Sequence, residues 1–372
     1  MEHTFTKKIK KILQKHFKDN SEDIYGKSEL LQYINFKTRS AEKGSKARSS
    51  FANLYAIYIL IEDYITNGFE KNDKYKDYSG AEFSKLFTRQ RELPFGRKLQ
   101  NHALNNRMNS EFQKFFPTSS YIPILRNLET NRYWINENLI KITLTKKKYN
   151  ISEAIIEIID EYVKTKRDSF ERFISNCIEL QNMEKEKSSK VQEFIKSLLK
   201  PNVDARLFEI VSYSILRSHY KNQKIYWGFE KTSIREDFLK LFKTGRTNAN
   251  DGGIDFVMKP LGRFFQVTET LDVKKYFLDI DKIERYPITF VVKTDLTERE
   301  ITSLLEKNAQ QLYSVKDIVK KYMSSIEEVI NIPKLTKIFD ESVKKGNLGE
   351  ILDEIIRQSK VEFSYQELEP DK

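Results

Sequence analysis

The sequence predicts two parts, a mainly α-helical N-terminal domain over residues 1–190 and an α/β domain over residues 191–372. Apolar residues recur at helical spacing up to about Leu180, whereas short apolar runs then alternate with helical segments. Alternation of strands and helices is typical of helices packed on a central sheet. The longest nearly hydrophobe-free stretch, Gln181 to Lys190, is taken as the boundary. With 372 residues, each part is long enough to bury its own core.

The first half contains one dominant apolar segment. Leu54 to Ile65 is the most apolar predicted helix, and we expect it at the centre of the N-terminal core. Ile151 to Val163 also has helical spacing. Between them, Arg132 to Asn136 and Leu139 to Leu144 are interpreted as short strands or a turn-linked ribbon.

In the second half, the sequence predicts helices first, then strands, and then helices again. The expected elements are helices over Val191–Leu199 and Ala205–His219, a strand over Lys224–Phe229, a charged helix or loop, a hairpin, a strand over Ile288–Lys293, and helices from Thr297 to Gln358.

The charge balance favours a polyanionic partner. The chain has 65 Lys and Arg against 54 Asp and Glu, a formal net charge of +11. Such an excess suits nucleic acid or an anionic membrane surface, although a lysine-rich composition alone would give the same excess.

Several classes of protein are excluded. Cys177 is the only cysteine, which rules out a disulfide framework and a thiolate zinc site; we interpret it as a small residue on a helix face. No run approaches the length of a membrane span, and Met1 to Phe17 lacks the uninterrupted apolar core of a secretory signal. The sequence therefore predicts a soluble, cytoplasmic protein with no membrane partner.

The predicted hairpin carries the most informative side chains. Asp255 begins an apolar run after a glycine pair, and Lys259-Pro260-Leu261-Gly262 suits a tight turn. With Pro260 and Leu261 at the turn, Asp255 lies opposite Gln266, and Thr268 shares a face with Gln266. Two oxygen donors held across a hairpin suit a hard divalent cation such as Mg²⁺, as in nuclease metal sites.

A third candidate precedes the hairpin. Glu209 lies amid apolar residues of the Ala205–His219 helix, where an unpartnered carboxylate is costly to bury. On the helix alone, a position at the edge of the apolar stripe, in water or in an ion pair, is the better explanation of Glu209, and the downstream sequence shifts the balance toward a site residue.

The ordered set of Glu209, Asp255 and Gln266 resembles the PD-(D/E)xK nuclease superfamily in its Mrr-like and type II restriction branches. The run from Gly245 to Glu269 is most similar to HaeII-type restriction endonucleases. The resemblance covers roughly Asp204 to Lys293. It implies a restriction-endonuclease-like mixed sheet flanked by helices, with Asp255, Gln266 and Glu209 as ligands of Mg²⁺.

One position departs from this pattern. The family's lysine falls at position 268, where this chain has Thr268, which can hydrogen-bond a water but supplies no charge. Either the metal replaces that lysine or another lysine does, and Lys274 and Lys275 are favoured over Lys259 at the turn. Glu269 is a further candidate ligand only if the strand is irregular.

The implied substrate is double-stranded DNA. Arg246 is a candidate phosphate contact, and Asn248 and Asn250 are turn formers that could also touch phosphate or bases. A basic stretch over residues 37–50 and a second one near residue 90 supply further contacts or are solvated loops. The candidates in these two stretches are Arg39, Lys43, Lys46, Arg48, Arg89 and Arg91.

Three functions follow from these observations. The first is a Mg²⁺-dependent type II restriction endonuclease that hydrolyses duplex DNA at a short specific site, as a homodimer matched to a palindromic site. The second is a modification-dependent or repair nuclease of the same fold. The third is a non-catalytic DNA-binding protein whose site has decayed, suggested by Thr268.

Overall fold

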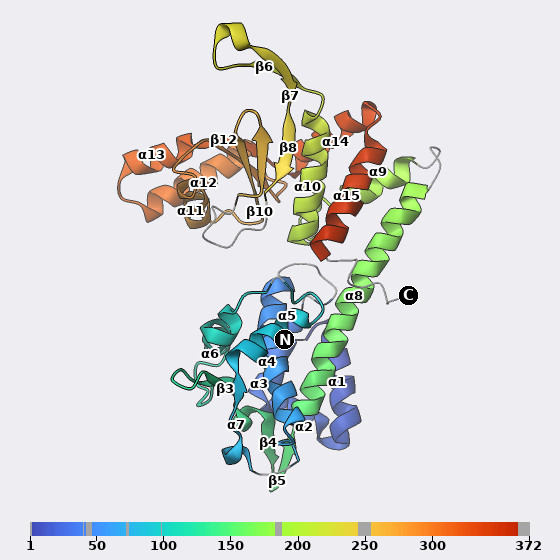
Figure 1. The fold of residues 1–372 in the computed structure, drawn as a ribbon, viewed down its shortest axis with the longest axis vertical. Coiled ribbons are helices and arrows are strands. Elements are labelled where there is room, and N and C mark those ends of the chain that lie inside the picture. Colours follow the sequence, from blue (N-terminus) through green and yellow to red (C-terminus); the bar gives the residue numbers. More distant parts are fainter. Residues whose placement is uncertain are drawn as a thin grey trace. The chain divides into compact units, whose positions relative to one another are not determined.

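The chain divides into two compact units, Met1–Phe173 and Ile174–Lys372. The computed structural model describes residues 2–39, 41, 47–71, 74–97, 99–182, 188–244 and 254–363 (Figure 1). The division falls inside helix α8 (Ser152–Asn182), earlier than the predicted boundary after residue 190. The predicted helix over Ile151–Val163 is thus only the beginning of a much longer one.

Unit 1 is mainly helical, with two small sheets. Its other helices are α1 (Thr4–Phe17), α2 (Ser21–Lys27), α3 (Glu29–Thr38), α4 (Ala47–Thr66), α5 (Phe83–Glu92), α6 (Met108–Phe115) and α7 (Glu137–Ile140). Its strands are β1 (Ala81–Glu82), β2 (Ile124–Asn127), β3 (Arg132–Ile135), β4 (Lys141–Leu144) and β5 (Lys147–Asn150). They form an antiparallel sheet of order β1-β3-β2 and the hairpin β4-β5.

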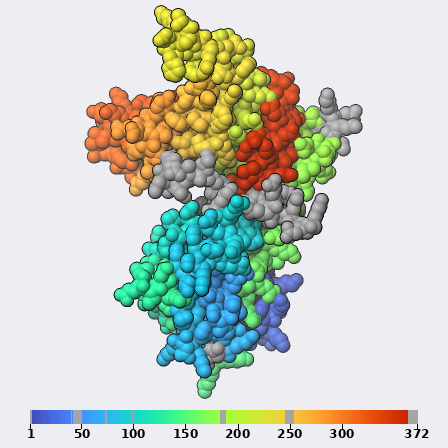
Figure 2. Space-filling model, in the orientation of Figure 1, coloured from blue at the N-terminus to red at the C-terminus, as the bar shows by residue number. Residues whose placement is uncertain are grey.

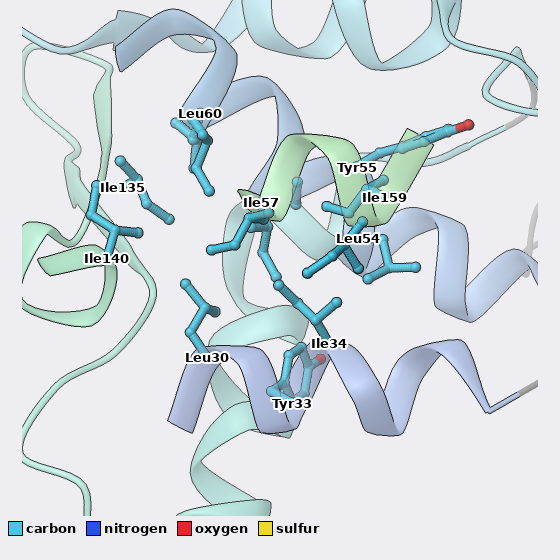
Figure 3. Close-up of a cluster of buried hydrophobic side chains, with 14 of the residues drawn as sticks. Leu30, Tyr33, Ile34, Leu54, Tyr55, Ile57, Leu60, Ile135, Ile140 and Ile159 are labelled. Carbon is cyan, nitrogen blue, oxygen red and sulfur yellow. The ribbon is translucent and has the colours of Figure 1, made fainter. Parts of the chain in front are cut away.

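The core of unit 1 is built around α4, as predicted. Leu54, Ile57 and Leu60 of α4 are fully buried and meet Leu30 and Ile34 of α3 (Figure 3). Burying such side chains stabilises the fold by roughly 1.5–3 kcal/mol each.

Unit 2 is built on a five-stranded mixed sheet of order β12-β11-β10-β9-β8. Its strands are β6 (Lys224–Trp227), β7 (Arg235–Phe238), β8 (Lys240–Lys243), β9 (Phe256–Lys259), β10 (Arg263–Thr268), β11 (Ile288–Val292) and β12 (Ile326–Ile330). Its helices are α9 (Ser188–Ser197), α10 (Ala205–Tyr220), α11 (Val273–Asp281), α12 (Glu298–Leu312), α13 (Lys316–Ser324), α14 (Ile332–Lys344) and α15 (Leu348–Phe363). β8, β9 and β10 are antiparallel neighbours, whereas β10, β11 and β12 run parallel. The expected α/β architecture, a mixed sheet with flanking helices, is confirmed.

Helices cover both faces of this sheet. The ring of Phe256 lies 5.2 Å from that of Tyr213 and the ring of Phe265 lies 6.1 Å from that of Tyr220, so one face packs on α10. On the other face, Ile288 and Phe290 of β11 join a core with side chains of α11, α12 and α13. Since side chains alternate along a strand, each residue of β10 is directed toward one of these two layers.

Three of the strands described in unit 2 were not predicted, and neither were β1, β2 and β5 of unit 1. β7 and β8 occupy the segment expected as a charged helix or loop, and β12 interrupts the expected C-terminal helices. β8 and β12 are four- and five-residue edge strands of the central sheet, too short and too charged for their alternation to show in the sequence. β6 and β7 form a separate ribbon that protrudes from the rest of unit 2, in yellow in Figure 2.

Within the described part of the chain, no helix is long and apolar enough to cross a membrane. Cys177 is fully buried, and burial raises the pKa of its thiol to about 12. That environment agrees with the interpretation of Cys177 as a packing residue, because a reactive cysteine needs an accessible thiolate.

Candidate functional site

Helix α10 carries Glu209 near its N-terminus, which Asp204 caps. The Asp204 carboxylate accepts hydrogen bonds from the backbone amides of Arg206 at 2.7 Å and Leu207 at 3.2 Å, which satisfies two amide groups of the first turn. Glu209 follows one turn later and is only 7% exposed. Of the two alternatives to a ligand role, a carboxylate in water is therefore wrong, whereas an ion pair is what the structure shows, since Glu209 pairs with Arg206 and Lys243.

Asp255 lies immediately before β9 and interacts electrostatically with Glu209. Its Oδ2 accepts a hydrogen bond of 2.8 Å from the backbone amide of Val267 in β10. Burial and the negative charge of Glu209 raise the pKa of Asp255 to about 7. The Val267 amide and the cations of Arg206 and Lys243 lower this pKa again, but they offset only part of the increase.

The charge of Glu209 is balanced by two cations that the sequence analysis did not identify. Lys243 Nζ, at the end of β8, lies 2.8 Å from Glu209 Oε1, and Arg206 is paired with Glu209 Oε2. Arg206 also lies 3.7 Å from the Glu362 carboxylate. A buried carboxylate requires such partners, so the burial of Glu209 was a signal that cations lie beside it.

The hairpin register is the predicted one, but the shared face is not. Phe265 pairs with Phe256, and Phe264 with Val257, as expected for a turn at Pro260 and Leu261. Next to these pairs, however, the amide of Asp255 donates to the carbonyl of Phe265, 3.2 Å away. Asp255 and Phe256 therefore both face Phe265, as in a β-bulge, in which one extra residue re-aims a side chain.

This bulge separates two residues that were expected to act together. Asp255 is turned toward Glu209 and the α10 layer, whereas Gln266 alternates with Phe265 and belongs to the opposite face. Gln266 is 7% exposed, and its Oε1 is a buried atom that accepts no hydrogen bond within the described residues.

Thr268 lies on the same face of β10 as Gln266 and contacts one of the predicted lysines. Lys275 Nζ, on α11, is 3.3 Å from Thr268 Oγ1. The other two candidates, Lys274 and Lys259, are exposed. Of the three lysines proposed to replace the one missing at position 268, Lys275 alone has a recorded contact with Thr268.

Glu269, just after β10, is engaged by a further buried lysine. Lys293 Nζ pairs with the Glu269 carboxylate and donates to the carbonyl of Val203, just before α10. The side chain of Lys293 is only 3% exposed. The carboxylate of Glu269 therefore already has a cationic partner, Lys293.

The predicted DNA contacts of unit 1 differ in how accessible they are. Arg39 is exposed, with its guanidinium 4.6 Å from the centre of the Phe36 ring. Arg91 is also exposed and donates to the carbonyl of Arg97. Arg89, by contrast, makes two 2.8 Å hydrogen bonds with the Glu62 carboxylate, so this ion pair would have to break before Arg89 could bind phosphate.

The remaining predicted contacts cannot be placed. Lys43, Lys46, Arg246, Asn248 and Asn250 lie outside the described residues, and Arg48 is described by its backbone alone, at the start of α4.

The carboxylate pair suits a hard divalent cation in its chemistry. Mg²⁺ prefers oxygen ligands and one or two carboxylates, and a cation between Asp255 and Glu209 would relieve the repulsion that raises the pKa of Asp255. No three His, Cys, Asp or Glu side chains form a metal-binding group in the ranges that the structure describes. Gln266 does not fit as a third ligand in this arrangement, because the bulge leaves it on the other face.

Comparisons with models of protein families, with curated proteins and with solved structures find no match for this chain.

Proposed function

We propose that the chain is a Mg²⁺-dependent type II restriction endonuclease that hydrolyses phosphodiester bonds of duplex DNA at a short specific site. The observation that carries this proposal is the pair formed by the half-buried Asp255 and the buried Glu209 at one end of a mixed sheet, with Lys243 and Arg206 beside them. Paired carboxylates next to cations suit a phosphodiester, whose hydrolysis needs a metal site and stabilisation of added negative charge.

The residues of the chain have distinct roles in this proposal. Asp255, oriented by the Val267 amide, and Glu209 would hold Mg²⁺, which when bound lowers the pKa of a coordinated water and stabilises the leaving oxygen. Arg206 and Lys243, which both pair with Glu209, hold its carboxylate in place before metal and DNA arrive. Gln266 supports the fold of β10 or contacts the substrate from the other face.

The partner in this proposal is double-stranded DNA bound by a homodimer. Two-fold symmetry would present two such sites to the two strands of a palindromic sequence. The net charge of +11 supports a polyanionic substrate.

Digestion of plasmid DNA tests the function directly. With Mg²⁺ we expect discrete fragments with identical end sequences, and with EDTA no cleavage. If fragments arise only from methylated plasmid, the protein is a modification-dependent nuclease and not the proposed type II enzyme. DNA binding without cleavage at any Mg²⁺ concentration would replace it with the decayed, non-catalytic protein.

Charge reversal in the first basic stretch tests which residues contact DNA. Changing Arg39, Lys43, Lys46 and Arg48 to Glu should weaken DNA binding and flatten its salt dependence, since each lost phosphate contact removes about 0.9 from the slope of log K against log salt. Fluorescence anisotropy at several salt concentrations measures both quantities. An unchanged affinity and slope would make the stretch a surface loop without a role in binding.

A further inference from the structure

Because Thr268 stands where the resemblance implies a lysine, the positive charge of the proposed site must come from another residue. Three lysines lie within reach of the strands that carry the site. Lys275 contacts Thr268 on the α11 face, Lys293 is committed to Glu269, and Lys243 contacts Glu209 on the α10 face. Lys243 and Lys293 each pair with a different carboxylate, whereas Lys275 contacts the hydroxyl of Thr268.

Lys243 is the lysine that the backbone holds beside both carboxylates. It pairs with Phe256 in the β8–β9 register, next to Asp255, and the following amide of Thr244 donates to the Asp255 carbonyl at 3.0 Å. Its Nζ is 2.8 Å from Glu209 Oε1, and its side chain is 18% exposed. The ammonium group is thus fixed at the carboxylate pair and is still within reach of solvent.

The bulge at Asp255 excludes Lys275 from the same role. Because Asp255 is turned toward α10, the carboxylate pair and Thr268 lie on different faces of the sheet. Lys293 does not fit this role either, because its amine pairs with Glu269, donates to the Val203 carbonyl and is almost completely buried.

We propose that Lys243 supplies the positive charge of the active site, in place of the lysine missing at position 268. The inference depends on the proposed nuclease function. Without substrate, Lys243 pairs with Glu209; with DNA and metal bound, its flexible stem carries the ammonium to a non-bridging oxygen of the scissile phosphate.

In the chemical step, Lys243 neither gains nor loses a proton or a bond. The oxygen of water forms a bond to phosphorus while the bond from phosphorus to the 3′ oxygen breaks. A proton of the attacking water passes to solvent, and the 3′ oxygen takes a proton from solvent. Lys243 stabilises the additional negative charge on the phosphorane oxygens between these events.

Replacement of Lys243 by methionine tests the inference, because methionine keeps most of the length and removes the charge. In single-turnover cleavage at saturating Mg²⁺, Lys243→Met should reduce the rate by roughly 10²-fold or more. Lys243→Arg should recover part of that rate. Lys240→Met is the matched control, since Lys240 lies on the same strand with a side chain that is 61% exposed, and its rate should equal that of the wild type.

A second measurement separates a catalytic role from a structural one. Lys243 and Mg²⁺ compete for Glu209, so Lys243→Met should bind Mg²⁺ more tightly than the wild type in calorimetry without DNA. Loss of fold would instead weaken Mg²⁺ binding, and the thermal melting curve of each variant reports it independently.

The outcomes distinguish this inference from the proposed function. A wild-type protein that cuts no DNA overturns the nuclease proposal itself. A wild-type protein that cuts, with Lys243→Met equally active, overturns only the assignment of Lys243. A loss of 10²-fold or more in Lys275→Met combined with full activity in Lys243→Met returns the role to Lys275.

Discussion

Asp255→Ala should reduce the rate of DNA cleavage by about 10³-fold or more, while DNA affinity stays at the wild-type level. The substitution removes a carboxylate of the metal pair and the acceptor of the Val267 amide, but it leaves the basic surface intact. Cleavage is measured on supercoiled plasmid and affinity by anisotropy without Mg²⁺. Full activity of Asp255→Ala would remove Asp255 from the site.

Two further substitutions rank the other proposed ligands. Glu209→Ala should also lose most activity, because Glu209 is the second carboxylate of the pair. Gln266→Ala should be affected less than Glu209→Ala, because the bulge directs Gln266 to the other face. The reverse order would mean that Gln266, and not Glu209, holds the metal.

The stability of the metal-free protein should fall as the pH rises from about 4 to about 7. In the folded state Asp255 has a pKa of about 7, against its ordinary value of 3.8, because of burial and the nearby Glu209. In this window the unfolded chain releases a proton that the folded chain keeps, so each pH unit lowers the free energy of unfolding by up to about 1.4 kcal/mol. Below this window both states are protonated and the contribution of Asp255 to stability is constant.

Asp255→Asn isolates this effect. An asparagine oxygen can still accept from the Val267 amide but never ionises, so the variant should melt at a higher temperature than the wild type at pH 8 in EDTA. At pH 4 the difference should vanish. Mg²⁺ at pH 8 should raise the melting temperature of the wild type but not of Asp255→Asn, and equal shifts in both proteins would contradict a metal site at Asp255.

The elements that the sequence predicted are those set by local signals. The apolar spacing identified α10, and the turn at Pro260 and Leu261 set the register of β9 and β10. The apolar run of α4 identified the centre of the first core. In each case the residues that determine the structure are close together in the chain.

The parts that escaped prediction depend on tertiary contacts. The bulge that turns Asp255 away from Gln266 arises where β9 pairs with β10, and no residue type in the sequence predicts it. Lys243 was missed because β8 is a short edge strand, recognisable only by its pairing with β9. The candidate carboxylates were thus found from sequence, whereas the cations beside them required the fold.

Helix α10 packs against α14 and α15, and this packing has a consequence for protein synthesis. α10 carries Glu209 and packs against α14 and α15, where Arg217 pairs with the buried Glu354 and Arg206 approaches Glu362. A growing chain that already contains residues 209, 243 and 255 therefore still lacks the surface that holds α10 on the sheet. In the proposed nuclease, the site would therefore be complete only after α15 has left the ribosome, and a chain ending before residue 348 should neither complete unit 2 nor cut DNA.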